Sequence, residues 1–260
     1  MNSLQVLLVK EFRESWRSFK FIWIPLVFIL LGVSDPVMNY FMEDILKAVG
    51  NMPEGFQMMM PELQPLDLLM ASTGQFQLIG VIVLIAVFVG TISRDRSSGT
   101  ATLIYIRPVS AVSLFMSKWI VAALVAILSA VLGYAGSLYY TSVLYGSVSF
   151  KDALIMIVTY AVWLLFVMAL TVALSAAFST GLAATIAIIV IPIGGMIDSI
   201  IGSFWNASPW KLVSYGVMLG SDTALYDDYW KTLAVTFGLI IICLVVGVWA
   251  TRYNRSRTKV

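Results

Sequence analysis

The residues that could carry chemistry in this chain are few, and most of the usual sets are missing from the sequence. None of the 260 residues is a histidine, and Cys243 is the single cysteine. Histidine is the side chain most used for metal ligation and for proton transfer near neutral pH, so most hydrolase and metalloenzyme functions are disfavoured. The glycine-rich phosphate-binding motifs are absent as well. We therefore expect no catalytic set and no cofactor.

Two carboxylates, Asp35 and Asp198, fall inside apolar runs. An ionisable group within a membrane span marks a pathway by default, because a charge in lipid is costly. Both lie toward the ends of their runs, where a carboxylate can still reach water. They are candidate pathway residues that would line an outward-facing cavity, and plain solvation at the interface is the alternative. A carrier driven by protons or sodium would normally have more such groups.

The segment from Arg94 to Ser110 combines basic residues with helix-capping and helix-breaking residues. Ser98 can cap a short helix, and Pro108 ends it by forcing the preceding residue out of helical geometry. The resulting stub has about two turns and a length of roughly 12 Å. Ser110 can then cap a new helix that carries Lys118 into the next apolar run. A mere connector needs only a few residues, so we interpret this segment as a docking element.

Membrane-spanning helices must position these residues. The chain is 60% hydrophobic and 12% charged, with a mean hydropathy of +0.93, whereas soluble domains are about 45 to 50% apolar and about 25% charged. A helical crossing needs about 20 mostly apolar residues. The sequence thus predicts an all-α membrane protein with one transmembrane domain over residues 1–260. The predicted spans are 21–42, 76–93, 119–144, 153–178, 182–201 and 231–250.

The first of these spans is the least regular. Its apolar run is unbroken only from Phe21 to Ser34, so the helix must continue through Asp35 and Pro36 to Met42. A signal peptide is the alternative, but about twenty residues precede the apolar core and no A-x-A-like cleavage site follows. We therefore expect a true span here.

The distribution of basic residues predicts the orientation. Six spans place both termini on one side, and most of the 16 Lys and Arg residues lie in the termini or between spans two and three. This set of twelve is Lys10, Arg13, Arg17, Lys20, Arg94, Arg96, Arg107, Lys118, Arg252, Arg255, Arg257 and Lys259. Basic residues concentrate on the cytoplasmic side. We expect a multi-pass protein of the cell (inner) membrane with both termini cytoplasmic.

Residues 1–20 predict an amphipathic helix that lies flat in the inner interface. Apolar side chains recur at steps of three or four residues, with basic residues opposite them. The apolar set is Leu4, Leu8, Phe12, Trp16 and Phe19. A plain extension of the first span is the alternative.

Two other segments are predicted on the outer side. Residues 43–75 form a proline-broken loop, and residues 202–229 are too apolar for an open loop and form short half-buried helices. One of these helices begins with Ser208 as N-cap and Pro209 as first helical residue. Within the third span a small-residue face favours close packing inside the subunit. This face consists of Ser129, Gly133 and Ser137.

The docking element resembles the coupling helix of the second-type exporter permeases of ATP-binding-cassette transporters. The shared order is an acidic residue, a few polar residues, Gly99-Thr100, a short apolar helix, Pro108-Val109-Ser110 and then Lys118. Asp95 stands where that family usually has glutamate, and Ala101-Thr102 interrupts its leucine pattern.

Three other places agree with the resemblance, which covers the whole chain. They are the amphipathic start with Lys10 and Glu11, the outer segment with Ser208-Pro209-Trp210 before the last span, and the basic tail after it.

The resemblance implies a transport mechanism that depends on other subunits. Two permease subunits, identical or sister chains, would form a pathway, and separate ATPase subunits would bind beneath them. A ligand shifts a conformational equilibrium only by binding two states unequally, and here the ligand is the closed ATPase. The lipid bilayer is expected to surround the chain. No nucleic acid is expected among the partners. The implied coupling residues are Arg94, Asp95, Arg96, Gly99, Thr100, Leu103, Arg107 and Pro108.

The nearly uncharged spans favour an apolar or amphiphilic substrate, moved outward. Two alternatives remain open from the residues alone. One is a stand-alone channel or secondary carrier that uses Asp35 and Asp198, and the other is an immunity protein that binds a peptide at its outer face.

Overall fold

The structure is a computed structural model that describes residues 3–42, 44–45, 63–98, 109–202, 204–220 and 226–257. Every regular element in these ranges is helical, and 6 helices are long and apolar enough to cross a membrane. The predicted all-α membrane fold with six spans is confirmed. The elements are α1 Ser3–Arg17, α2 Lys20–Tyr40, α4 Pro65–Gln75, the π-helix η1 Phe76–Gly80, α5 Val81–Phe88, α6 Ser93–Ser97, α8 Ala111–Leu144, α9 Phe150–Ala177, α10 Thr180–Ile201, α11 Lys211–Gly220 and α12 Tyr226–Arg257.

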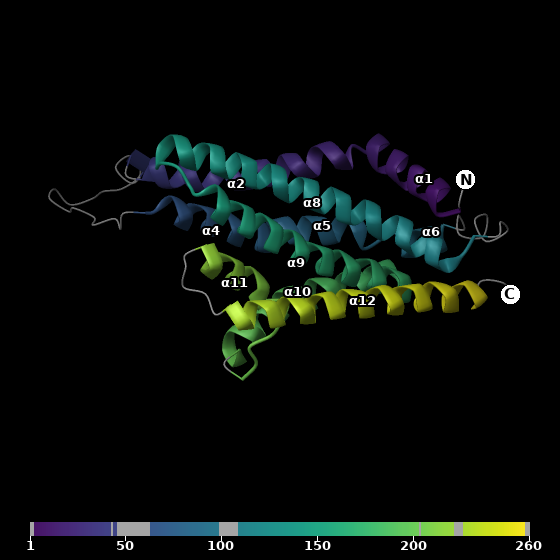
Figure 1. Cartoon of the computed structure of the whole chain (residues 1–260). Coiled ribbons are helices and arrows are strands. Elements are labelled where there is room, and N and C mark those ends of the chain that lie inside the picture. The colour runs from purple at the N-terminus through teal and green to yellow at the C-terminus, as the bar shows by residue number, and fades with distance from the viewer. Residues whose placement is uncertain are drawn as a thin grey trace.

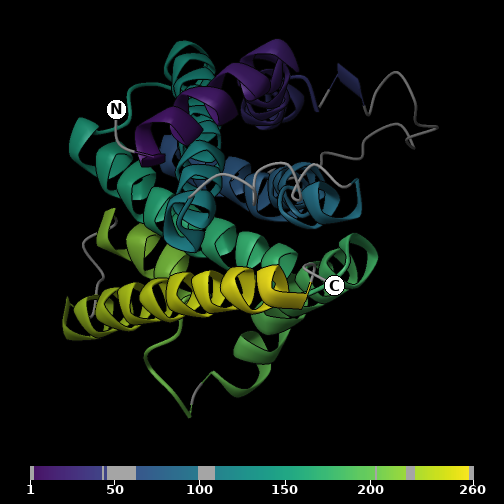
Figure 2. The same cartoon turned by 90° about the vertical axis from the view of Figure 1, so that its right-hand side faces the viewer.

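The helices are arranged in three layers (Figures 1 and 2). α1, α2 and α8 form one outer layer, α9 lies in the middle with α4 and α5, and α10, α11 and α12 form the other outer layer. The start of α1, α6 and the end of α12 lie at one end of the bundle, which we call the terminal end. We call the opposite end, where α4 begins, the distal end. Both termini thus lie at the same end, as an even number of spans requires.

Aromatic rings fill the centre of the bundle. Phe28, Phe76, Tyr134 and Tyr160 are fully buried, and the ring centroids of Phe76 and Tyr134 are 5.1 Å apart. Rings at such spacings pack edge to face and add to the burial of apolar area. This cluster joins α2, η1, α8 and α9 in one core.

The small residues of α8 provide close packing, as the sequence predicts. A Cβ added at Gly133 would lie 2.9 Å from the carbonyl oxygen of Phe28, so α2 and α8 approach through backbone atoms. Ser137 shares a hydrogen bond of 2.8 Å with Ser72 of α4, and Ser129 is fully buried. Helices gain no hydrophobic free energy by leaving lipid for one another, so close contacts of this kind hold neighbouring spans together.

The second span begins well before the predicted start at residue 76. The elements α4, η1 and α5 follow one another without a gap from Pro65 to Phe88, so residues 65–75 are not part of an outer loop. Pro65 occupies the first helical position, and the backbone N–H of Gln64 donates to the Asp67 carboxylate at 3.0 Å. The proline at the first helical position and the capping hydrogen bond start a helix at Pro65, although the polar composition of the segment is typical of a loop.

The other helix ends also differ from the predicted spans. α8 begins at Ala111 instead of 119, because the Ser110 hydroxyl accepts from the backbone N–H of Ser113 at 3.0 Å. The predicted cap at Ser110 is therefore confirmed. α12 extends from 226 to 257, beyond the predicted 231–250, because polar residues continue the helix outside the apolar run. α9 and α10 begin at Phe150 and Thr180, within a few residues of their predicted starts.

The first span and the N-terminal helix are separate helices. α2 continues through Asp35 and Pro36 to Tyr40, as predicted. α1 ends at Arg17, and Phe19 takes a left-handed conformation with φ 56°. That conformation breaks a helix, so the plain extension of the first span is wrong.

α1 packs on α8 through a face that the apolar repeat did not indicate. Its buried residues are Leu7, Glu11 and Ser15, while Phe12 and Trp16 are exposed. The exposed aromatic side matches the predicted interfacial face. The buried side brings a carboxylate into the protein interior, and this carboxylate belongs to the site described below.

The segment after α10 forms the predicted half-buried helix, but its start was predicted wrongly. α11 begins at Lys211, and the Ser208 hydroxyl donates to Asp198 instead of capping the helix. Leu212 is fully buried against the bundle. The Trp210 ring lies over Gly194 of α10, and its Nε1 donates to the carbonyl oxygen of Ile191 at 2.8 Å.

Candidate functional site

Only three of the predicted coupling residues lie in the part of the chain that the structure describes. Arg94, Asp95 and Arg96 lie on α6, the short helix that follows α5 at the terminal end. Five others lie outside the described residues: Gly99, Thr100, Leu103, Arg107 and Pro108. Ser98 ends α6, and its hydroxyl donates to the carbonyl oxygen of Asp95 at 3.4 Å. The helix predicted after Ser98 also lies outside the described residues.

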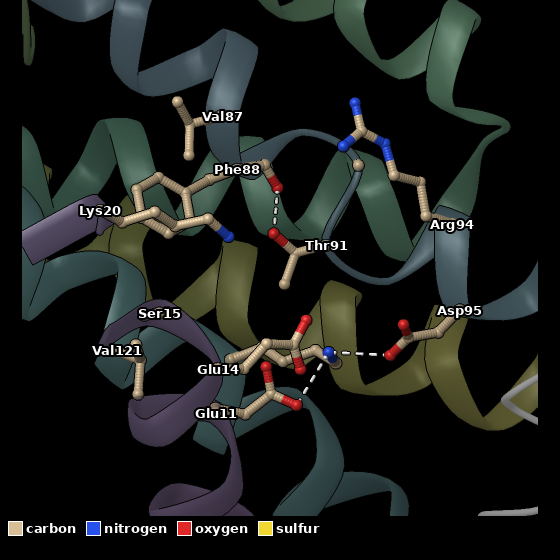
Figure 3. Close-up of a pocket in the computed structure, with 12 residues that line it drawn as sticks. Glu11, Glu14, Ser15, Lys20, Val87, Phe88, Thr91, Arg94, Asp95 and Val121 are labelled. Atoms are coloured by element: carbon tan, nitrogen blue, oxygen red, sulfur yellow. Dashed lines mark hydrogen bonds and ion pairs between the residues drawn. The ribbon is translucent and has the colours of Figure 1, made fainter. Parts of the chain in front are cut away.

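A buried lysine joins α6 to two other helices (Figure 3). Lys118 Nζ of α8 lies 2.8 Å from Asp95 Oδ2 and 3.0 Å from Oε1 of Glu11 in α1. The side chains of Lys118 and Glu11 are only 2% and 7% exposed. A buried charge is tolerated only when it is paired, so each of these helices holds the others in register. We call Glu11, Asp95 and Lys118 the ion cluster.

Arg96 fixes α6 to the end of α9. Its Nη1 donates to the carbonyl oxygen of Ala176 at 2.6 Å, and Nη2 donates to the carbonyl oxygen of Phe178. The last carbonyls of a helix lack partners within it and carry partial negative charge, so a guanidinium is well suited to both. Asn254 of α12 donates to the same Ala176 oxygen at 2.8 Å. Three helices therefore meet at one carbonyl group.

The start of α6 is bound to α9 and α10 through hydroxyl groups. Ser175 Oγ accepts from the backbone N–H groups of Ile92 and Ser93, at 3.0 and 3.2 Å. Ser93 also shares a hydrogen bond of 2.7 Å with Thr180. α6 is thus held on both sides, by the ion cluster and by the α9–α10 connection.

Arg94 points in a different direction from its neighbours. Its side chain extends away from Asp95 in Figure 3, and a Cβ added at Gly90 would lie 2.5 Å from Arg94 Nε. The glycine therefore leaves room for the guanidinium. Arg94 is exposed, so it presents a charge on the surface of α6 next to the undescribed segment.

The two predicted pathway carboxylates do not face a common pathway within this chain. Asp35 on α2 and Asp198 on α10 lie in opposite outer layers. Asp35 Oδ1 accepts from Nε2 of Gln75 at 2.7 Å. Asp198 Oδ1 accepts from Trp205 Nε1 at 2.9 Å and from Ser208 Oγ at 2.6 Å, and the residue is 8% exposed. Asp198 is therefore a buried acceptor that fixes the segment after α10, and its role in a pathway stays a prediction.

Glu11 and Lys118 were both recognisable in the sequence, but their pairing with each other and with Asp95 was not predicted. Glu11 lies on the i, i+4 face that it shares with Leu7 and Ser15, a weak signal beside the stronger aromatic repeat. Lys118 is a lone charge at the edge of an apolar run, which indicates that an acid must lie nearby. Ser175 and Asn254 carry no signal at all, because they act through contacts distant in the sequence.

The arrangement suits mechanical linkage and not bond chemistry. Within the described residues, no group of His, Cys, Asp or Glu side chains could hold a metal ion. The charged contacts at the terminal end bind α6 directly to α8 and α9, and through these shared partners to α1 and α12. The fold and this network define a membrane protein with a cluster of paired charges at the terminal end of its bundle.

Comparison with known proteins identifies the family. Residues 5–256 match the sequence profile of the ABC-2 family transporter proteins, so the chain belongs to this family. It is also similar to an uncharacterized transmembrane protein of Bacillus subtilis strain 168, YxlG, with 28% identity over 259 residues. That alignment covers 98% of this chain and 100% of the relative. The resemblance noted in the sequence is thereby confirmed, and the chain is a membrane protein of a transporter family.

Proposed function

We propose that this chain is the permease subunit of an ATP-binding-cassette exporter. It moves an apolar or amphiphilic substrate outward, using ATP that a separate subunit hydrolyses. Two permease subunits, identical or sister chains, form the pathway, and both termini of each are cytoplasmic.

The observation that carries this proposal is the double attachment of α6. Asp95 is paired with Lys118 on one side, and Arg96 binds the end of α9 on the other. Residues 99–108 lie between α6 and α8, so any partner that binds them acts directly on two anchored helices. Family membership and the absence of nucleotide-binding motifs in the chain both fit a subunit driven by another protein.

The wall of the bundle supports the choice of substrate class. Large apolar side chains cover the exposed faces of α2, α10 and α12, including Leu30, Ile200 and Val245. A surface without charges does not stabilise a charged solute, but it accommodates apolar groups.

The test is isolation of the tagged chain from the membranes of its host in mild detergent. We expect a nucleotide-binding subunit to co-purify, and the Arg94→Glu, Arg107→Glu double variant to lose it. A matched control changes two lysines outside the predicted coupling segment, Lys151→Glu with Lys231→Glu, and should retain the partner. Association that persists after reversal of both arginines contradicts the proposed coupling role.

A second measurement separates the proposal from the stand-alone carrier. The purified chain alone, reconstituted in liposomes, should move no amphiphilic dye along an imposed proton or sodium gradient. Gradient-driven flux that Asp35→Asn abolishes would instead assign the chain to secondary carriers.

A further inference from the structure

A small charged cavity lies beside the ion cluster. It has a volume of about 90 Å³ and is bounded by α1, α5, α6, α8 and the start of α2. Three acidic and three basic side chains line it, so its formal charge balances (Figure 3). These are Glu11, Glu14, Asp95, Lys20, Arg94 and Lys118. Such a cavity is large enough for water and offers more than one partner to each charge.

The charges are unevenly paired. Lys118 holds both Glu11 and Asp95, whereas Glu14, whose side chain is 60% exposed, pairs with the exposed Lys10 at 3.7 Å. Among the ion pairs of the described residues, none joins Glu14 to Lys118, although the charge of Glu14 interacts with that of Lys20 in the cavity wall. The cavity therefore contains a second carboxylate of α1 that Lys118 does not use.

The position of this carboxylate is regular. Glu11 and Glu14 lie three residues apart on α1, which separates them by about 4.5 Å along the helix axis and puts them on neighbouring faces. Both line the cavity that Lys118 enters. Glu11 would not be left unpaired if Lys118 moved on, because Lys10 Nζ is already 3.2 Å from its Oε1.

We propose that Lys118 exchanges Glu11 for Glu14 during transport, so that α1 steps by about one helical turn along α8 while α6 and α8 keep their contacts with the rest of the bundle. This inference rests on the proposed function. Asp95 stays with Lys118, so α6 and α8 remain joined. Between the two carboxylates, the buried Lys118 would be paired with Asp95 alone and would lack its second partner, so the step has two discrete positions. Glu14 is thus a positioning residue, used only in the second position.

The test compares Glu14→Gln with Arg13→Gln, an exposed neighbour on the same helix. Both variants are studied as the complex with its ATPase in proteoliposomes, with a fluorescent amphiphile as transported probe. Glu14→Gln should keep the wild-type melting temperature, since the resting pairs of Lys118 are intact, yet transport per ATP hydrolysed should fall at least tenfold. Glu14→Asp should restore most of it, and Arg13→Gln should match the wild type.

The outcomes separate the two proposals. A wild-type complex that shows no ATP-driven transport contradicts the proposed function. A working wild type with an equally efficient Glu14→Gln variant overturns the one-turn step alone. A purely structural role of the cluster also predicts a neutral Glu14→Gln variant.

A distance measurement observes the step without removing a charge. Spin labels at Val6→Cys in α1 and Val112→Cys in α8, both exposed positions, are placed in a Cys243→Ala background. We expect two distances that differ by up to about 5 Å, the rise of one helical turn, with their populations changed by a non-hydrolysable ATP analogue in the complex. A single distance in both the complex and the isolated chain in nanodiscs overturns the step, whatever the chain transports.

Discussion

Lys118 Nζ of α8 lies 2.8 Å from Asp95 of α6, and the two residues bracket the segment predicted to contact the ATPase. Glu11 of α1 contacts the same nitrogen at 3.0 Å. The helix that the sequence indicated only as an interfacial element is therefore connected by charge to both ends of the coupling segment.

Removal of the lysine alone should be severely destabilising. Lys118→Met leaves two carboxylates near a vacated buried site, and loss of one partner of a buried pair typically costs about 3 to 5 kcal/mol. We expect a large drop in the melting temperature of the purified chain in detergent.

The cycle that checks this prediction removes all three charges. Lys118→Met combined with Glu11→Gln and Asp95→Asn should recover most of the lost stability, because no unpaired charge remains. If the triple variant is less stable than Lys118→Met, the interpretation as a charge cluster is wrong.

The stability of the chain should depend more on the charge of Arg96 than on that of Arg94. Arg96→Gln removes the donors to the carbonyl groups of Ala176 and Phe178, and hydrogen bonds to charged groups contribute about 1.5 to 3 kcal/mol each. Thermal unfolding should therefore begin at a lower temperature in Arg96→Gln. Arg94→Gln, at an exposed position, serves as the matched control and should unfold like the wild type. Equal melting temperatures for the two variants would contradict the capping role of Arg96.

Two glycines in the distal half of the bundle should respond differently to substitution by alanine. A Cβ at Gly133 would lie 2.9 Å from both Phe28 O and Phe76 Cζ, whereas one at Gly74 meets nothing within 4 Å. Gly133→Ala should destabilise the chain by about 1 to 3 kcal/mol through overpacking. Gly74→Ala should be neutral or stabilising, because alanine has the higher helix propensity. Urea or thermal unfolding of both variants in the same detergent gives the comparison, and a stable Gly133→Ala chain would show that α2 and α8 are not closely packed.

Asp198 should tolerate asparagine but not alanine. Both of its hydrogen bonds, from Trp205 and Ser208, reach the same oxygen, and asparagine retains an oxygen there. Alanine would leave two donors without an acceptor, at a cost of about 1 to 3 kcal/mol for each buried one. Limited proteolysis of the segment around Trp205 reports its anchoring. A transport defect in Asp198→Asn with intact protection from protease would favour the pathway role over the structural one.

The local features of the fold were predictable from the sequence, and the long-range ones were not. Ser110 as a helix cap and continuation of the first span through Pro36 follow from rules that involve a few neighbouring residues. The start at Pro65 was equally readable, since Gln64 and Asp67 form a recognisable capping pair, but the polar composition of that stretch led to a loop prediction.

The candidate site depends on pairs that no short window contains. Glu11 and Lys118 are 107 positions apart, and Arg96 reaches a carbonyl group whose availability depends on where α9 ends. A single lysine at the edge of an apolar run indicates that an acidic partner is needed, but it does not indicate which of several carboxylates provides it. Only the packing of α1 against α8 decides that.

The helix α8 runs for 34 residues from Ala111 to Leu144 without a proline. At 1.5 Å per residue this makes a rod of about 50 Å, longer than the roughly 30 Å hydrocarbon core. A stiff rod cannot absorb a push by bending at its middle, so a tilt of only about 5° at its base sweeps its far tip sideways by roughly 4 Å. A displacement at the base of α8 would thus move the far end of the helix at the opposite surface of the membrane, without a series of side-chain rearrangements between them.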